Sequence, residues 1–308
     1  TYDPLHGRVI IPLRDTLGRV VGFTGRQMEA KEDSPKYKNT RETVVFHKGE
    51  VLFGYKNAQE MIRRGEFKHL LVVEGQLKAI ASNHYGWPTI SAGGTAITPK
   101  QIEAVKRLEP RTIYYVPDRD KAGAEAVWRN VPLFRAERLD VKIASVKIPD
   151  HLKEKLTGKV DPDDLLAAGE AKLEYQSSDL VTWLYRQTVK GRELTPGDAL
   201  NVSKKILPVI QQHPDPLVRD VEIRQLAKLS GVSEASLRSE KTPKRTFTPP
   251  PRIPHQRMTP ARQLCASLLK LNANQLRCRD DPAEIWWWAF LDWTDLPLEL
   301  VGTLQLIA

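Results

Sequence analysis

Two short apolar runs that each end in acidic residues decide the fold: Leu70-Leu71-Val72-Val73-Glu74-Gly75 and Tyr114-Tyr115-Val116-Pro117-Asp118-Arg119-Asp120. A run of this kind is too short for a helix, and its apolar residues predict a buried strand of a parallel sheet. Ligands of open α/β sheets bind beyond the carboxyl ends of the strands. We therefore expect the two acidic ends to face each other at a cation site.

The chain around these runs alternates between strand and helix patterns. We expect strands over 70–74, 88–91, 112–116 and 141–148, and helices through 80–85, after Thr98, and over 121–135. Thr98, Pro99 and Gln101 have the pattern of an N-cap, a first-turn proline and a capping box. This alternation predicts an α/β fold, in which helices cover both faces of a parallel sheet.

The segment before the sheet is polar and basic. Residues 8–25 alternate like a β-hairpin, and a helix is expected over 55–64. Between them lies a polar, basic stretch that contains Arg26, Lys36, Tyr37, Asn39 and Lys48, and taken alone it favours a solvated lysine-rich loop.

The segment after the sheet is helical. Residues 226–233 have the outline of a helix-turn-helix, which indicates either a DNA-binding module or two packed helices. Residues 241–259 are rich in proline and basic residues and predict a linker. Helical patterns resume after it, and the spacing of Trp286 and Phe290 favours a core over a binding site.

Composition narrows the class of protein. The length of 308 residues allows two domains, and the net charge of +9 favours a polyanionic partner such as nucleic acid, although some basic domains are merely soluble. Cys265 and Cys278 are the only cysteines, which argues against a zinc ribbon or a disulfide framework. No signal sequence or membrane-spanning run occurs, so we expect a cytoplasmic protein, and the pattern that starts at Thr1 suggests a fragment.

Five acidic residues form the candidate site, and they are Glu74, Asp118, Asp120, Asp161 and Asp163. Each acid alone could be a helix cap or a surface charge, and Asp163 could cap the helix that contains Leu165. All five, however, lie at the ends of elements at one edge of the predicted sheet. Carboxylates this close need a compensating cation, and the usual one for a set of oxygen ligands is Mg²⁺ or Mn²⁺.

These motifs resemble a known domain. Val73-Glu74-Gly75, the turn Ser91–Thr95 and the run from Asp118 to Gly123 are similar to the TOPRIM domain of topoisomerases and bacterial primases. The flanking motifs narrow the resemblance to replicative primases of the DnaG type. They are Arg8–Asp15, Gly22–Arg26, Pro35–Asn39, Phe46–Gly49 and Asp161-Pro162-Asp163.

The resemblance implies a nucleotidyltransferase that copies single-stranded DNA into short RNA primers from ribonucleoside triphosphates. Glu74 would be a general acid/base or a metal-linked acid, Asp118 and Asp120 would share the catalytic site, and all five acids would hold Mg²⁺ or Mn²⁺. Lys121 would join Arg26, Lys36, Tyr37, Asn39 and Lys48 in binding nucleotides or nucleic acid. Zinc would be expected only in a missing N-terminal domain.

The resemblance also implies partners and a domain order. The partners would be the template, the RNA primer, the replicative helicase through the C-terminal region and a single-stranded DNA-binding protein, without a membrane, at the replication fork in the nucleoid. A TOPRIM sheet would be preceded by a mixed α+β subdomain and followed by helical subdomains. The expected parts are the basic end of an N-terminal polymerase subdomain (1–65), the TOPRIM domain (66–172), a helical subdomain (173–240), the linker (241–259) and the start of a helicase-interacting domain (260–308).

Lys78 departs from the family pattern, in which an Asp follows the Glu by four residues. At about 4 Å and an effective dielectric constant near 20, two unit charges interact by roughly 4 kcal/mol, and a divalent ion by about twice that. Lys78 is therefore expected to point away, to pair with Glu74 or Asp118, or to weaken metal binding. Two other functions stay open: a TOPRIM nuclease or topoisomerase-like enzyme, and a non-catalytic adaptor for single-stranded DNA and a helicase.

Overall fold

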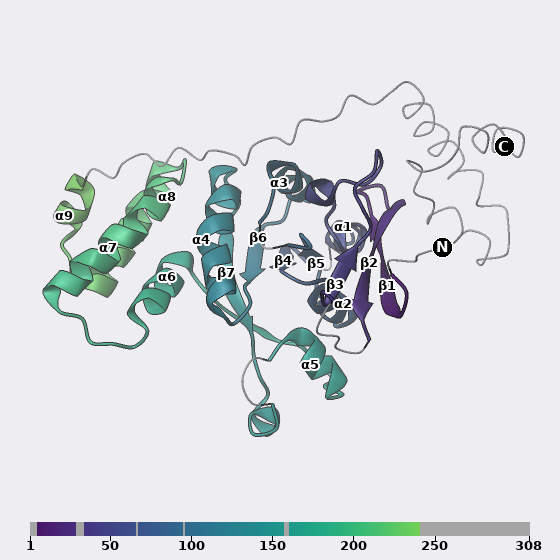
Figure 1. The fold of residues 1–308 in the computed structure, drawn as a ribbon. Coiled ribbons are helices and arrows are strands. Elements are labelled where there is room, and N and C mark those ends of the chain that lie inside the picture. Colours follow the sequence, from purple (N-terminus) through teal and green to yellow (C-terminus); the bar gives the residue numbers. More distant parts are fainter. Residues whose placement is uncertain (1–4, 29–33, 66, 95, 157–159, 241–308) are drawn as a thin grey trace, which may run out of the picture. The chain divides into compact units, whose positions relative to one another are not determined.

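The computed structural model describes residues 5–28, 34–65, 67–94, 96–156 and 160–240 (Figure 1). The expected linker (241–259) and the expected helicase-interacting module (260–308), with Trp286 and Phe290, lie outside the described residues. Two compact units are present. Among the described residues, the first holds 5–14 and 19–47, and the second holds 15–18 and 48–240.

The first unit is a three-stranded antiparallel sheet. Its strands are β1 (Arg8–Arg14), β2 (Val20–Gln27) and β3 (Tyr37–Asn39), in the order β1-β2-β3. The hairpin predicted over 8–25 is confirmed, and Ile11 lies opposite Thr24 in it. Phe46 is buried against β2 at Gly22, where a Cβ atom would lie 2.9 Å from Cγ of the phenylalanine ring. A glycine is thus required for this packing.

The second unit contains a five-stranded sheet in the order β5-β4-β6-β7-β8. The four predicted strands are confirmed and pair in parallel; they are β4 (His69–Val73), β5 (Thr89–Ser91), β6 (Thr112–Val116) and β7 (Val141–Val146). The fifth strand, β8 (Tyr175–Ser178), pairs antiparallel with β7. It was not predicted, because this part of the chain was expected to be helical and its sequence is short and polar.

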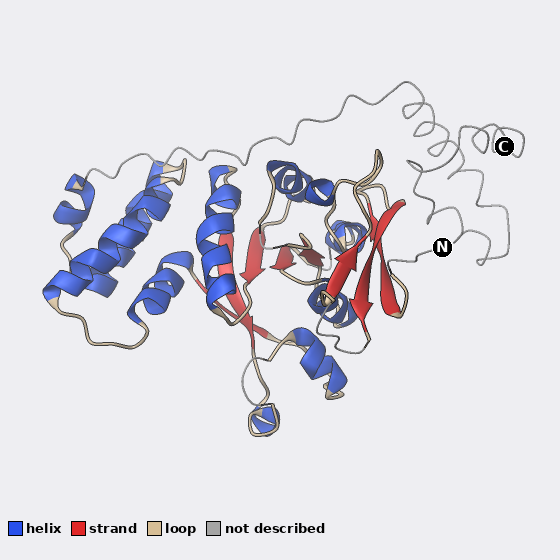
Figure 2. Cartoon of the chain, in the orientation of Figure 1, coloured by secondary structure: helices blue, strands red, loops and turns tan. Residues whose placement is uncertain are grey.

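Helices flank the sheet, as the alternation predicts (Figure 2). Those next to the sheet strands in sequence are η1 (Lys48–Glu50), α1 (Tyr55–Arg63), α2 (Gln76–His84), α3 (Pro99–Lys106), α4 (Lys121–Ala136), η2 (Asp150–Leu152) and α5 (Pro162–Ala167). Those that follow are α6 (Leu180–Val189), α7 (Pro196–Gln211), α8 (Pro216–Ser230) and α9 (Glu234–Ser239). The predicted capping box of Thr98 and Gln101 is present at the start of α3. None of the described helices is long and apolar enough to cross a membrane.

Alternation along β4 places apolar side chains on both faces of the sheet. Leu70 and Val72 belong to the core that includes Phe134 of α4, whereas Leu71 and Val73 pack with Ala79 of α2. Figure 1 shows α4 running beside β6 and β7. A central strand that is buried on both faces has little freedom to move, so the residues that follow it are held in fixed positions.

The helices α6 to α9 pack on the same core as α4. Residues from α6, α7, α8 and α9 contribute to it, including Leu226 and Leu237 on either side of the turn at Gly231. The helix α8 ends at Gly231, whose φ of 74° suits a glycine, and Ser233 caps α9. The interpretation as two packed helices therefore accounts for this segment.

Residues 48–65, which were predicted to belong to the preceding subdomain, lie in the compact unit of the five-stranded sheet. The backbone of Phe53 exchanges two hydrogen bonds with Ser91 at the end of β5, with N···O distances of 2.8 and 3.0 Å. Tyr55 and Ala58 of α1 also lie in the main core. The segment that carries Lys48 is therefore fixed to the sheet.

Candidate active site

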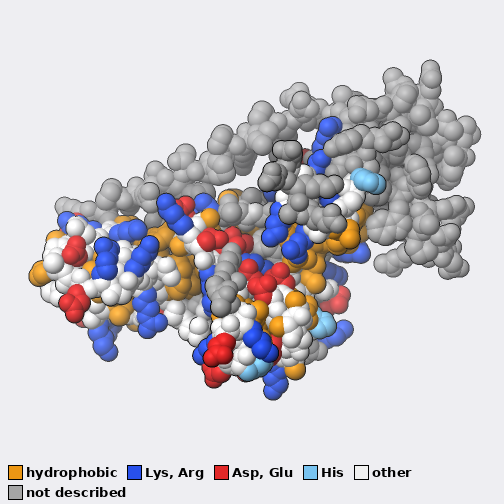
Figure 3. Space-filling view, turned by 60° about the horizontal axis from the view of Figure 1, so that its bottom comes forward, with side chains coloured by type: hydrophobic (Ala, Val, Ile, Leu, Met, Phe, Trp, Pro, Cys, Tyr) orange, Lys and Arg blue, Asp and Glu red, His pale blue; other side chains and the backbone are white. Residues whose placement is uncertain are grey.

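The carboxyl ends of β4 and β6 bring Glu74 and Asp118 together. These strands are neighbours, and Val73 lies opposite Val116 in their parallel register. The backbone N–H of Asp118 donates to Glu74 Oε1 at 3.3 Å. The expected meeting of the two acidic strand ends is therefore confirmed, and acidic side chains gather on the face that Figure 3 draws.

The third strand end at this edge is the turn after β5. The hydroxyl of Ser91 donates to the Glu74 carbonyl at 2.7 Å and accepts from the N–H of Gly93 at 3.1 Å. A Cβ atom on Gly94 would lie 3.9 Å from Lys48 Nζ. The turn therefore fixes the backbone of Glu74 and lies beside Lys48. The sequence motif included Ser91, but its hydrogen bond to Glu74 was not foreseen.

Glu74 lies in a setting that favours its neutral form. Burial raises the pKa of Glu74 above its ordinary value, and the nearby Asp118 carboxylate raises it further. The hydrogen bond from the Asp118 N–H and the charge of Lys78 act in the opposite direction. A carboxylate with a raised pKa is a stronger proton acceptor than an ordinary one.

Asp120 faces the start of α4. Its carboxylate accepts from the Gly123 N–H at 2.8 Å and caps the helix. Gly123 itself lies against the turn, since a Cβ atom there would clash with the backbone of Asp118. Lys121 begins α4; its exposed ammonium lies 3.9 Å from the Glu125 carboxylate. The run from Asp118 to Gly123 thus joins the strand end to the helix as one rigid turn.

Lys78 pairs with acids from two other elements. Its Nζ atom contacts Asp118 Oδ1 and lies 2.9 Å from Asp161 Oδ1. Of the three expected alternatives for Lys78, the structure shows pairing, with Asp118 as foreseen. The second partner was not foreseen, because Asp161 lies far along the chain. A single ammonium group therefore connects α2, the end of β6 and the start of α5.

Asp161 and Asp163 occupy different positions at α5. Asp161 is the N-cap of α5, and its N–H donates to Asp164 Oδ2 at 2.8 Å. The alternative that Asp163 caps this helix is therefore wrong. Asp163 Oδ1 is buried with no hydrogen-bond partner among the described residues, and burial raises the pKa of Asp163.

The oxygen atoms of the five acids are suitable ligands for a divalent ion, but the positions of these acids are less suitable. Carboxylate oxygens suit Mg²⁺ or Mn²⁺, and the buried Asp163 Oδ1 atom has an unused acceptor. However, the Lys78 ammonium already lies between Asp118 and Asp161, and Asp120 is engaged in helix capping. Within the part of the chain that the structure describes, no three His, Cys, Asp or Glu side chains are placed to hold one ion.

The candidate nucleic-acid residues divide between the two units. In the first unit, Arg26 and Tyr37 are opposite each other on β2 and β3, and the guanidinium lies 6.0 Å from the ring centroid. Asn39 is two residues further along β3, opposite Thr24. Lys36 precedes β3, and its carbonyl accepts from the Gln27 N–H at 3.0 Å. Lys48 and Lys121 lie in the second unit.

Arg8 holds the segment that precedes Lys36 and Tyr37 in place. It belongs to a motif of the sequence, but it was not predicted as a site residue. Its guanidinium donates to the Gly25 carbonyl at 3.0 Å and to the Pro35 carbonyl at 2.9 Å. It also donates to the Ser34 hydroxyl at 2.6 Å. Arg8 thereby holds the approach to β3, where Lys36 and Tyr37 lie.

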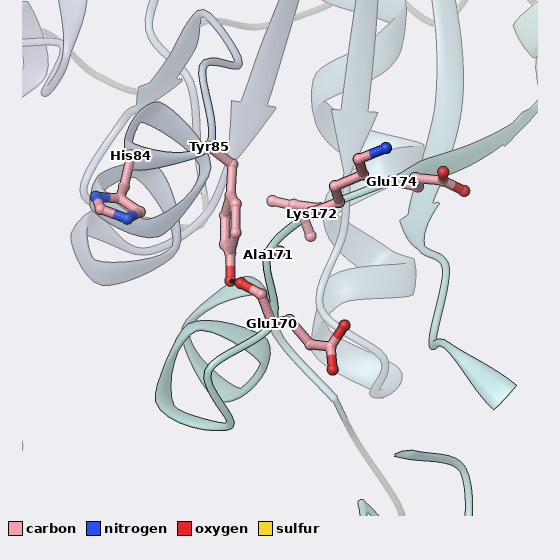
Figure 4. Close-up of a pocket in the computed structure, with 7 residues that line it drawn as sticks. His84, Tyr85, Glu170, Ala171, Lys172 and Glu174 are labelled. Carbon is pink, nitrogen blue, oxygen red and sulfur yellow. Dashed lines mark hydrogen bonds between the residues drawn. The ribbon is translucent and has the colours of Figure 1, made fainter. Parts of the chain in front are cut away.

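A separate pocket of about 410 Å³ lies at the opposite end of α2 from Lys78. It is lined by His84, Tyr85 and residues 170–174, and Figure 4 shows the Tyr85 hydroxyl directed at Glu170. That hydroxyl donates to the Glu170 carbonyl at 2.8 Å. The pocket shares no residue with the five acids, so it is not the candidate site.

Three family models match the chain. The N-terminal domain of the DNA primase catalytic core matches residues 1–59, and the Toprim-like model matches residues 71–166. The DnaB-helicase binding domain of primase matches residues 181–235, which extend from α6 to α9. The expected helicase contact from 260–308 lies outside the described residues, and this match is upstream of it.

Curated relatives and solved structures agree with these matches. The DNA primase of Escherichia coli (strain K12) is 32% identical over 252 residues, which are 79% of this chain and 41% of that protein. The DNA primase of Deinococcus radiodurans is 36% identical over 170 residues, which are 55% of this chain and 27% of that protein. The chain thus spans about two fifths or less of these two relatives.

Among solved structures, the catalytic core of Escherichia coli primase is 32% identical, with a TM-score of 0.58, and the match covers 75% of this chain and 72% of that one. A DnaG primase catalytic domain bound to single-stranded DNA is 30% identical, with a TM-score of 0.57, and the match covers 76% and 73% of the two chains.

Proposed function

This chain belongs to the DnaG-type family of DNA primases, and from that premise we propose that it carries out metal-dependent synthesis of short RNA primers on single-stranded DNA. The activity of the family is nucleotidyl transfer of the RNA polymerase type. The observation that carries the proposal is the contact between Glu74 and Asp118 at the edge of the sheet, within the segment that matches the Toprim-like model.

Glu74 is the proposed general acid/base. Its carboxyl group is half-buried and its pKa is raised, so it can take a proton from the attacking hydroxyl of a primer strand and release it later. The Asp118 N–H would hold the Glu74 carboxylate in place, and the Ser91 hydroxyl would fix the backbone of Glu74 by donating to its carbonyl. Asp118 and Asp120 complete the proposed catalytic set, the latter by fixing the turn before α4.

The family uses divalent metal ions. We propose Mg²⁺ or Mn²⁺ as the cofactor, with the candidate ligands Glu74, Asp118, Asp120, Asp161 and Asp163. When bound, such an ion would supply neutralisation of the triphosphate charge. Asp118 and Asp161 are the ligands for which the present arrangement fits least, because Lys78 pairs with both.

Substrates would be held by basic and aromatic side chains. Arg26, Lys36, Tyr37 and Asn39 are proposed to contact the template or primer strand, since cations bind phosphates and aromatic rings stack on bases. Lys48 and Lys121 are proposed to contact ribonucleoside triphosphates, because Lys48 lies beside the turn after β5. The proposed setting is the replication fork in the bacterial nucleoid.

The proposed protein partner is the replicative helicase. The support for this partner is the match of residues 181–235 to the helicase-binding domain of primase. Residues 260–308 remain a proposed second part of the contact, and a single-stranded DNA-binding protein is a further proposed partner. Copurification of the helicase with the chain, and its loss when the exposed Leu217 and Val221 of α8 are changed to Ser, would test this partner.

Labelled ribonucleotides, a single-stranded DNA template and Mg²⁺ test the proposed activity. Glu74→Gln should lower RNA synthesis by about 10²-fold or more, since it removes the proton acceptor but keeps the shape of the side chain. Glu137→Gln is the matched control, since the exposed Glu137 pairs with Lys106, outside the proposed site, and the change should leave the rate unchanged.

Other outcomes of this assay identify the alternatives. Nicked template without RNA products would indicate a TOPRIM nuclease. DNA binding without products would indicate a non-catalytic adaptor, a function that the pairing of Lys78 with two acids favours. RNA synthesis that persists in Glu74→Gln would contradict the proposed role of Glu74.

A further inference from the structure

The Lys78 ammonium is a cation in the centre of the acidic edge. Its side chain is only 13% exposed, and its two partners, Asp118 and Asp161, are 22% and 24% exposed. The three residues come from α2, the loop after β6 and the cap of α5. A positive charge this poorly exposed is stable only when it is paired, and here it has two carboxylate partners.

The backbone holds Lys78 in this position. The Ser82 hydroxyl, one turn further along α2, donates to the Lys78 carbonyl at 2.7 Å. The same hydroxyl lies 2.7 Å from the Tyr175 hydroxyl of β8. The base of the lysine side chain is therefore tied to the sheet, and its four-carbon chain carries the ammonium to the acids.

The contact of Lys78 with Asp118 and Asp161 balances the charges of these two carboxylates. Two neighbouring carboxylates need a compensating cation, and a compact ammonium with three donors can supply it to both. A divalent ion that used the same two oxygens would have to displace Lys78 or accept its repulsion. Asp163, whose buried Oδ1 has no hydrogen-bond partner among the described residues, does not share the ammonium in this way.

We propose that Lys78 is a built-in counter-cation, which takes the position between Asp118 and Asp161 that a divalent ion would otherwise fill. The start of α5 is thereby held to the sheet edge without metal, and a divalent ion binds these two acids only at the cost of displacing the Lys78 ammonium or accepting its repulsion. The inference rests on one part of the proposed function, namely that a divalent ion binds at this edge of the sheet. It can be tested without primer synthesis.

Mn²⁺ binding to the chain, measured from the electron paramagnetic resonance signal of free Mn²⁺ without nucleotide or DNA, tests this proposal. Lys78→Met should lower the Kd for Mn²⁺ at least tenfold, because two carboxylates lose their counter-cation. Lys78→Arg, which keeps the charge, should leave the Kd within about twofold of the parent. Lys106→Met, which breaks the exposed pair of Lys106 with Glu137, is the control for loss of a lysine and should also leave it unchanged.

The site of the gain is tested by a second substitution. Adding Asp161→Asn to Lys78→Met should abolish the gain, since one of the two freed carboxylates is removed. An unchanged Kd in Lys78→Met, or a gain that persists in the double variant, overturns the proposal. Because no nucleotide is present, a failure here leaves the primer assay unaffected, and a failure of primer synthesis leaves this result unaffected.

Thermal unfolding covers the case in which Lys78→Met is unstable. In chelator this variant should unfold at a lower temperature than the parent, and Mn²⁺ should restore the midpoint, since an ion that binds the folded state stabilises it. The midpoint of Lys78→Arg should respond to Mn²⁺ no more than that of the parent. A Lys78→Met variant that stays unstable or unfolded in saturating Mn²⁺ contradicts the proposal.

Discussion

Gly123 has a steric role in the run from Asp118 to Gly123, whose other candidate site residues include the two acids Asp118 and Asp120. The first turn of α4 approaches the backbone of Asp118 so closely that a Cβ atom on residue 123 would lie 2.7 Å from the Asp118 nitrogen. The N–H of Gly123 at the same time donates to the Asp120 carboxylate. The position of both acids therefore depends on the absence of a side chain at this residue.

Gly123→Ala should lower the free energy of unfolding by about 1–3 kcal/mol, the usual range for overpacking a tight site. It should also lower RNA synthesis, because the turn that carries Asp118 and Asp120 must shift. Denaturant unfolding and the primer assay would measure the two effects. Gly197→Ala is the matched control, since the first turn of α7 has space for a methyl group. The free energy of unfolding of this variant should be unchanged or slightly raised.

At the scale of elements, a buried ion pair joins α4 to the helices that follow the sheet. Arg135 on α4 is 4% exposed and donates to the Glu222 carboxylate on α8 and to the Val209 carbonyl on α7. Burial raises the pKa of Glu222, and the Arg135 guanidinium opposes that shift. The packing of three helices thus depends on one guanidinium.

Arg135→Ala should lower the free energy of unfolding by about 3–5 kcal/mol, because it leaves the Glu222 carboxylate buried and unpaired. Lys106→Ala breaks an exposed pair with Glu137 and should cost less than about 1 kcal/mol. Denaturant unfolding measures both changes. A double variant, Arg135→Met with Glu222→Met, should recover much of the loss; equal costs for the two single changes would contradict this account.

His213, which follows α7, makes the stability of the same helices depend on pH. Burial lowers the pKa of His213 below its ordinary value of 6.5, and the charge of Arg135 lowers it further. The unfolded chain therefore takes up a proton at a higher pH than the folded chain does. The stabilising contribution is complete above pH 6.5 and is lost as the pH falls through the folded pKa.

Acidification from pH 7.5 to 5.0 should therefore lower the free energy of unfolding by at most about 1.4 kcal/mol per pH unit for this one proton, and the unfolding midpoint should fall with it. His213→Gln should make the midpoint less sensitive to pH over this range. Thermal unfolding at a series of pH values measures it. An identical pH dependence in the parent and in His213→Gln would show that other groups are responsible.

Elements with strong local signals could be predicted from sequence, and contacts between distant segments could not. The apolar run of β4 and the capping box before α3 depend on neighbouring residues, so the pattern is visible in the chain itself. The strand β8 has a polar sequence whose pairing is decided by β7. The contact of Lys78 with Asp161 depends on the path of the whole loop to α5, and no local pattern encodes it.

For the whole molecule, the net charge of +9 bears on how nucleic acid would bind. Phosphate contacts make affinity fall with salt, and for single strands the slope of log K against log salt is about 0.7 for each phosphate neutralised. Candidate basic residues occur in each of the two compact units. Sequence preference is expected to be weak, since phosphates carry no base information.

Arg26→Ala and Lys36→Ala should each reduce that slope by about 0.7, with little change in preference between template sequences. Fluorescence anisotropy of a labelled single-stranded DNA, titrated at several salt concentrations, measures the slope. Lys106→Ala is the control for removal of one positive charge and should leave the slope unchanged. Equal slopes in the parent and both variants would remove these residues from the proposed interface.

The edge strands of the five-stranded sheet affect the tendency of the molecule to aggregate. The open side of β5 is met by Phe53 through two backbone hydrogen bonds, and β8 at the other side has only four residues, three of them polar. Exposed apolar strands recruit strands from other molecules and lead to aggregation. One edge strand of this sheet is covered by Phe53, and the other is short and polar. The sheet is therefore a poor template for pairing with strands of other molecules, so we expect that the chain can be concentrated without aggregation through these edges.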